Sequence, residues 1–133
     1  MGQYDKLTSL IPRFERPAEE LAPYIKGNID DQGVIHIGYW DYDSVVDDFW
    51  EILYATWDTP RYREVLNEQH INPRRALAMD SYDSLDATAV LALLTWLTRA
   101  ERFGDGVIAG AISSGKLLRL LKRLEAIDDE QSS

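Results

Sequence analysis

The chain has 133 residues and a formal net charge of −9, with 14 Lys and Arg against 23 Asp and Glu. Hydrophobic residues make up 45% of it, which is too much for a disordered acidic tail, so we expect a folded chain. The absence of cysteine excludes disulfides, thiolate metal sites and a cysteine nucleophile. The net acidity argues against direct binding of nucleic acid, because neutralising phosphates needs clustered Lys and Arg.

The amino-terminal segment lacks the basic and then apolar pattern of a secretory signal, so we expect a cytoplasmic location. The longest uncharged run, Ala87 to Thr98, has twelve residues, whereas a membrane span needs about twenty. No repeat or linker divides the chain, which favours a single domain over 1–133 with a disordered tail at 128–133. The spacing of hydrophobic residues predicts a mainly α fold: a compact bundle of about six or seven helices around a buried central helix, with one short β element.

In the first part of the chain, the spacing of apolar residues predicts a helix over 4–14, with Pro12 ending or kinking it. Its inward face would consist of Tyr4, Leu7, Ile11 and Phe14. A short helix over 17–24 and a turn-rich stretch over 27–33 follow. The β-branched and aromatic run 34–40 predicts a strand. One strand cannot stand alone, so it must pair with another part of the chain or with a second subunit.

Helix signals dominate the rest of the chain. Ser44 is a plausible cap for a helix to about residue 58, whose inner stripe would be Val46, Phe49, Trp50, Leu53 and Trp57. Thr59-Pro60 predicts a helix to about 69, and Asn72-Pro73 predicts a short one through 79.

The longest predicted helix runs over 84–103, with Ser84 as its cap and Gly104 as its stop. It is apolar on all sides and is therefore the expected central helix. A short helix over 107–114 then ends at Gly115, and the last helix buries a leucine stripe made of Leu117, Leu120, Leu121 and Leu124.

The acidic residues are concentrated in one region. Residues 17–60 hold ten acids and a single base, Lys26, which accounts for the whole net charge of −9. Half of the fourteen aromatic residues lie between Tyr39 and Trp57. Because Trp40 and Tyr42 fall outside the inner helical stripe, they are the better interface candidates. We interpret this region as a partner-binding face that comprises Trp40, Asp41, Tyr42, Asp43, Asp47, Asp48 and Glu51.

Two functional hypotheses follow. The first is a non-enzymatic protein–protein interaction module that binds another protein with a basic surface, for example a phage-type inhibitor of the anti-restriction or anti-CRISPR kind that covers a nucleic-acid-binding surface. A homodimer in which the predicted strand pairs across a two-fold axis is compatible with this hypothesis and with the alternative that follows.

The alternative is a small metal-dependent phosphoesterase or nucleotide-handling enzyme. Asp41 and Asp43 follow an apolar strand, as the paired aspartates of haloacid-dehalogenase-type phosphatases do. Those enzymes need a larger doubly wound sheet than this chain can build. We therefore favour the first hypothesis and expect no catalytic residue, no cofactor and no metal.

Both ends of the chain resemble one protein family. The carboxy-terminal pattern consists of Arg99, Glu101-Arg102-Phe103, Gly106, Gly115 and the stretch 117–124, and the start Tyr4-Asp5-Lys6-Leu7 is also similar. This resembles domain of unknown function 6508, a family of small prokaryotic and phage proteins, and the resemblance implies a single compact fold and no mechanism.

The charged residues of that pattern also have a physical interpretation. Arg99, Glu101 and Arg102 lie at the end of a buried helix, where charges must be paired or near the surface. We interpret them as an ion-pair network that ties this helix to the next two, with a ligand site as the alternative.

Overall fold

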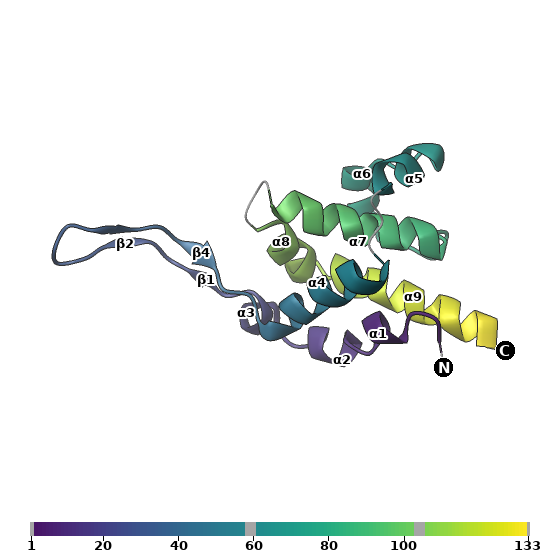
Figure 1. Cartoon of the computed structure of the whole chain (residues 1–133). Helices are drawn as coiled ribbons and strands as arrows, with labels where there is room; N and C mark the ends of the chain where they lie inside the picture. Colours follow the sequence, from purple (N-terminus) through teal and green to yellow (C-terminus); the bar gives the residue numbers. More distant parts are fainter. Residues whose placement is uncertain (1, 58–60, 103–105, 133) are drawn as a thin grey trace.

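The computed structural model describes residues 2–57, 61–102 and 106–132. The helices gather into one body, and a long β-hairpin extends from it on the side opposite both chain ends (Figure 1). The fold is mainly α with a short β element, as the sequence predicts. No helix in these ranges is both long and apolar enough to cross a membrane. The elements are α1 (Asp5–Thr8), α2 (Ile11–Phe14), α3 (Ala18–Leu21), β1 (Tyr24–Ile25), β2 (Asn28–Ile29), β3 (Ile35–His36), β4 (Tyr39–Trp40), α4 (Ser44–Trp57), α5 (Tyr62–Glu68), α6 (Pro73–Leu77), α7 (Ala87–Glu101), α8 (Val107–Ser113) and α9 (Lys116–Ser132).

Two short helices, α1 and α2, occupy the segment in which the periodicity predicts one helix. Pro12 lies in the first turn of α2, where its missing N–H costs no helical hydrogen bond, so it starts the second helix. α1 packs against α4 and α9, and Phe14 meets Phe49 edge to face with ring centroids 6.0 Å apart. The predicted inward residues are all buried: Tyr4, Leu7, Ile11 and Phe14.

The predicted inner stripe of α4 is confirmed for Val46, Phe49 and Leu53, which are buried, and Trp50 is half-buried. The side chain of Trp57 lies outside the described residues. The cap is Asp43 and not Ser44, because its Oδ2 accepts a hydrogen bond of 3.0 Å from the amide of Val45. A carboxylate at this position satisfies a free helix amide, and its negative charge interacts favourably with the positive end of the helix dipole.

α5 and α6 lie together on one side of α7 (Figure 1). The predicted start of α5 at Thr59-Pro60 lies outside the described residues. The Asn72-Pro73 start of α6 is confirmed, because Asn72 Oδ1 accepts from the amides of Arg74 and Arg75 at 3.1 and 3.2 Å.

α7 is the central helix that the sequence predicts. It packs against α4, α5, α8 and α9, and most of its residues are buried regardless of the side they occupy. Its cap is Asp86, whose Oδ1 accepts from the amide of Ala89 at 2.8 Å, so the helix begins later than a Ser84 cap would place it. The predicted stop at Gly104 lies outside the described residues.

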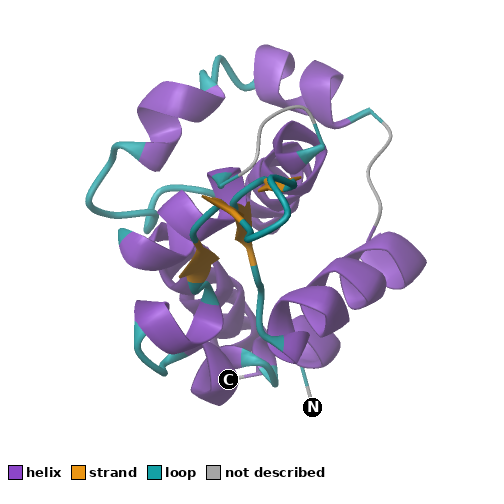
Figure 2. Cartoon of the chain, turned by 90° about the vertical axis from the view of Figure 1, so that its left-hand side faces the viewer, coloured by secondary structure: helices purple, strands orange, loops and turns teal. Residues whose placement is uncertain are grey.

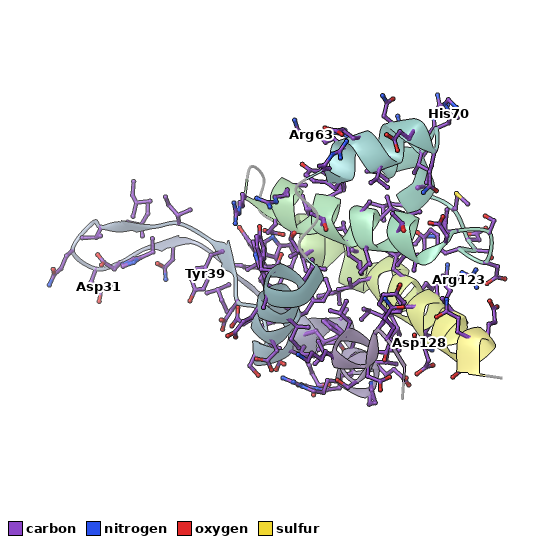
Figure 3. All side chains as sticks on the ribbon, turned by 45° about the vertical axis from the view of Figure 1, so that its right-hand side comes forward. Asp31, Tyr39, Arg63, His70, Arg123 and Asp128 are labelled. Carbon is purple, nitrogen blue, oxygen red and sulfur yellow. The ribbon has the colours of Figure 1, made fainter. Side chains whose placement is uncertain are left out.

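α8 and α9 are separated by Gly115, whose φ of +78° is the left-handed conformation that favours glycine. The predicted leucine stripe of α9 is buried. α9 continues to Ser132, although we expected a disordered tail from residue 128. Asp128 is only 6% exposed, and its two carboxylate oxygens accept from the amides of Gln3 and Tyr4 at 2.9 and 3.0 Å (Figure 3). The two ends of the chain are therefore joined through one carboxylate.

The predicted strand over 34–40 forms the second half of a hairpin within the same chain. β1 pairs with β4 and β2 pairs with β3, both antiparallel. The first half of the hairpin is the segment 24–29. The sequence alone assigns this segment to the end of a short helix and to a turn-rich stretch, and that assignment is wrong. We call residues 24–40 the hairpin arm. In Figure 2, which looks along it, the arm stands in front of the helical body.

Candidate partner-binding surface

The tip of the hairpin arm is built by its own residues. The Oδ1 atom of Asp30 accepts from the amides of Gln32 and Val34, each at 2.9 Å, and Gly33 adopts a φ of +78°. The Oδ2 atom of Asp30 lies 3.0 Å from Nε2 of His36 across the ladder. These hydrogen bonds, with that to His36 the strongest cause, lower the pKa of Asp30. The turn therefore holds the two strands in register without help from the helical body.

The two ladders of the hairpin arm have the same register, although Gly27 and Gly38 separate them along the strands. Asn28 is opposite His36 nearer the tip, and Ile25 is opposite Tyr39 nearer the base. Between these ladders the strands approach so closely that a Cβ atom on Gly27 would lie 2.5 Å from the carbonyl oxygen of His36. Glycine is required there because any larger residue would push the strands apart.

Alternation along the strands gives the hairpin arm two different faces. Residues directly opposite each other share a face, and the face changes at each step. One face is mixed and carries Tyr24, Lys26, Asn28, Val34, His36 and Trp40. The other is entirely apolar and consists of Ile25 (40% exposed), Ile29 (70%), Ile35 (72%), Ile37 (85%) and Tyr39 (52%). We call these five residues the apolar face.

The base of the hairpin arm is fixed to the helical body. Trp40 packs against Tyr24 with ring centroids 5.0 Å apart, and its indole nitrogen lies against Gly106, where a Cβ atom would come within 2.7 Å of it. The amide of Asp41 donates to the carbonyl of Pro23 at 2.9 Å. Trp40 is half-buried by these contacts, so the free part of the arm begins beyond it.

Tyr42 and Glu101 join the base of the arm to the start of α8. The Tyr42 hydroxyl donates to Oε1 of Glu101 at 2.8 Å, and it accepts from the amide of Ala109 at 3.1 Å. Glu101 also accepts from the amides of Gly106 at 2.9 Å and Ile108 at 2.8 Å. Its carboxylate thus satisfies amides that would otherwise be free at the helix start.

The two arginines flanking Glu101 lie over one aromatic ring. The guanidinium carbons of Arg99 and Arg102 are 5.0 and 5.3 Å from the centroid of Tyr54 on α4. These are cation–π distances, and they connect the end of α7 to α4. All three candidate ion-pair residues therefore contact other elements of the fold.

The predicted partner-binding residues divide into two groups. Tyr42 is held in the network above, and Asp43 caps α4 and accepts from Arg16 at 3.2 Å. The hydrogen bond from the Val45 amide is the main cause that lowers the pKa of Asp43. Asp48 is paired with Arg13 at 2.8 Å. The exposed members are Asp41, Asp47 and Glu51.

The sequence analysis missed the apolar face. Ile25, Gly27 and Ile29 alternate with Lys26 and Asn28, and Asp30 and Gly33 are turn formers. That combination is a hairpin signal, but the segment directly follows Pro23 and is rich in turn-forming residues, so it reads more readily as a loop. Among the described residues, no group of three or more His, Cys, Asp or Glu side chains is placed to hold a metal ion.

No curated protein and no solved structure matches the chain. A family model does match it, and the match extends over residues 2–130, which is nearly the whole chain. The chain therefore belongs to the family described as "Family of unknown function (DUF6508)".

Proposed function

We propose that this protein is a non-enzymatic protein-binding module whose docking element is the hairpin arm. One observation carries the proposal: seven of the eight large hydrophobic residues that are exposed in the described ranges lie on the arm. A two-stranded hairpin has no core of its own, and an exposed apolar patch of this kind is typical of an interaction site.

The charges around the arm indicate the chemistry of the partner. Asp31 is exposed at the tip (Figure 3). Asp41 is exposed near the base, and Asp47 and Glu51 are exposed on α4. Lys26 is the single Lys or Arg of the arm. The matching surface is an apolar cleft bordered by basic residues. A protein that binds nucleic acid through a basic surface has this character, which keeps the phage-type inhibitor hypothesis within the proposal.

The phosphoesterase alternative has weaker support. Both carboxylate oxygens of Asp43 already accept hydrogen bonds, one in the cap of α4 and one from Arg16. Asp41 is exposed beside it, and the strands of the described residues form a single hairpin in place of a doubly wound sheet. We therefore propose no reaction for this pair.

The test compares two variants of the arm. Ile35→Thr with Ile37→Thr makes the apolar face polar but keeps β-branched residues, whereas Asn28→Thr changes the opposite face. Immobilised wild-type and variant proteins are incubated with lysate, and the retained proteins are quantified in rising salt. We expect a retained protein that is lost from the double variant, is kept by Asn28→Thr and dissociates with salt. Equal retention by all three proteins would refute the proposal.

A further inference from the structure

The chain itself carries a cleft of the kind that its hairpin arm requires. Two cavities flank α8 and meet at Gly110. The smaller, of about 350 Å³, begins at Trp40 and is lined by α3 and α8. The larger, of about 630 Å³, is lined by Leu77, Trp96 and Val107 among other residues, mostly apolar. We call the two together the α8 groove.

The far end of the α8 groove is basic. Arg74 and Lys116 line the larger cavity. Arg74 is exposed, and Lys116 Nζ lies 3.8 Å from Oδ1 of Asp80 and donates to the carbonyl of Met79. Lys116 is largely buried and paired with Asp80, so Arg74 is the cation that the larger cavity offers to a hairpin tip carrying Asp30 and Asp31, while Glu19 lines the smaller cavity.

We propose that the partner of the hairpin arm is a second copy of this chain, and that each copy lays its apolar face in the α8 groove of the other. This inference rests on the proposed function of the arm as a docking element. Trp40 belongs both to the base of the arm and to the near end of the groove. α8 lies at the end of the body from which the arm departs (Figure 1). A two-fold axis would therefore bring the two arm bases together and point each arm over the body of the other copy, with its tip toward Arg74.

The area of the apolar face is sufficient for such a dimer. Its five side chains are 40% to 85% exposed, so covering them removes roughly 500–600 Å² of surface from water if a free Ile or Tyr side chain exposes about 150–200 Å². The contact occurs twice, so the two apolar faces alone contribute roughly 1,000–1,200 Å², which reaches the lower bound of a specific interface.

The test measures the oligomeric state. We expect light scattering at about 100 µM to give twice the chain mass of 15.2 kDa. Gly110→Trp fills the groove, and the helix accommodates it because a Cβ atom there would have no neighbour within 4 Å. It should weaken the dimer at least about tenfold without lowering the melting temperature. Thr88→Trp, at an exposed position of α7 away from the groove, is the control and should leave the dimer unchanged.

Disulfide trapping locates the contact. Ser113 lines the smaller cavity of the groove, and the chain has no cysteine, so the two single variants Ile37→Cys and Ser113→Cys can form only the introduced bonds. We expect oxidation of a mixture of the two variants to yield a cross-linked pair that joins position 37 of one copy to position 113 of the other. A monomer at about 100 µM, or a dimer unaffected by Gly110→Trp, would overturn the inference.

The failure of this inference differs from the failure of the proposed function. Suppose that the chain is monomeric but captures a protein in a salt-sensitive way, and that the double substitution in the arm abolishes the capture. This result refutes the second copy as the partner and keeps the arm as a docking element. A chain that dimerises equally well with and without the double substitution, and that also captures the same proteins with and without it, refutes both.

Discussion

Ile37 offers the sharpest prediction, because it is the most exposed residue of the apolar face and contributes nothing to the core. Ile37→Thr keeps a β-branched side chain but removes two apolar carbon groups, which are worth about 0.8 kcal/mol each when buried. Scaled by the 85% exposure that a partner would cover, the loss is about 1.4 kcal/mol, or roughly tenfold in the dissociation constant for each buried copy. A reciprocal dimer buries two copies, so its dissociation constant should rise roughly a hundredfold.

The assay is sedimentation equilibrium of wild type, Ile37→Thr and Asn28→Thr, together with urea unfolding of each. Because Ile37 is solvated in the free chain, the free energy of unfolding should change by less than about 0.5 kcal/mol when it is measured under monomeric conditions. Asn28→Thr should match wild type in both measurements. If Ile37→Thr destabilises the monomer by more than about 1 kcal/mol, the residue is buried in the free chain and the reasoning is wrong.

Three further predictions concern the contacts that hold the arm and the chain ends. Glu101→Ala removes the acceptor for two helix-start amides and a tyrosine hydroxyl, so the free energy of unfolding measured in urea should fall by about 2–4 kcal/mol. Glu101→Gln should lower the free energy of unfolding less. Equal losses in the two variants would contradict the capping role. Asp43 has a lowered pKa in the folded chain, so its contribution to stability is present above the usual pKa of 3.8 and is lost as the pH falls through the lower folded value. In an acid titration followed by circular dichroism, Asp43→Asn should remove that part of the pH dependence of stability. An unchanged profile would show that Asp43 does not contribute it. Asp128→Ala leaves two amino-terminal amides without their acceptor, so we expect a loss of about 1–3 kcal/mol and faster amide exchange in α1, and unchanged exchange would show that this carboxylate does not hold the amino terminus.

Much of the helical body could be predicted because its signals are local. Asn72-Pro73 marks a helix start through one side chain and two amides, and the leucine stripe of α9 follows from spacing alone. Caps are less certain when several candidates lie close together. Ser84 and Asp86 both suit the start of α7, and only the backbone geometry assigns the cap to Asp86.

The candidate site was predictable only in part. The acidic and aromatic composition led to the base of the arm, where Trp40 and Asp41 do lie. It did not lead to Ile29 or Ile37, because an exposed strand shows no contrast between a buried and a solvated face. Tyr42 was predicted as an interface residue, yet the structure holds it against Glu101, 59 positions away in the sequence.

By itself the sequence determined the helices, the burial of α7 and the regional concentration of acid, since each depends on spacing or composition over a few turns. Tertiary structure decided which segment pairs with 34–40, that Asp128 binds the amino terminus, and that Tyr42 and Asp43 are held within the fold. Those outcomes depend on contacts between residues that are distant in the chain or, for Asp43, on which of two adjacent side chains caps α4. Periodicity carries no information about such contacts. Strand pairing also decides that the apolar residues of this acidic region lie together on one face of the hairpin arm, with acidic residues at its tip and base.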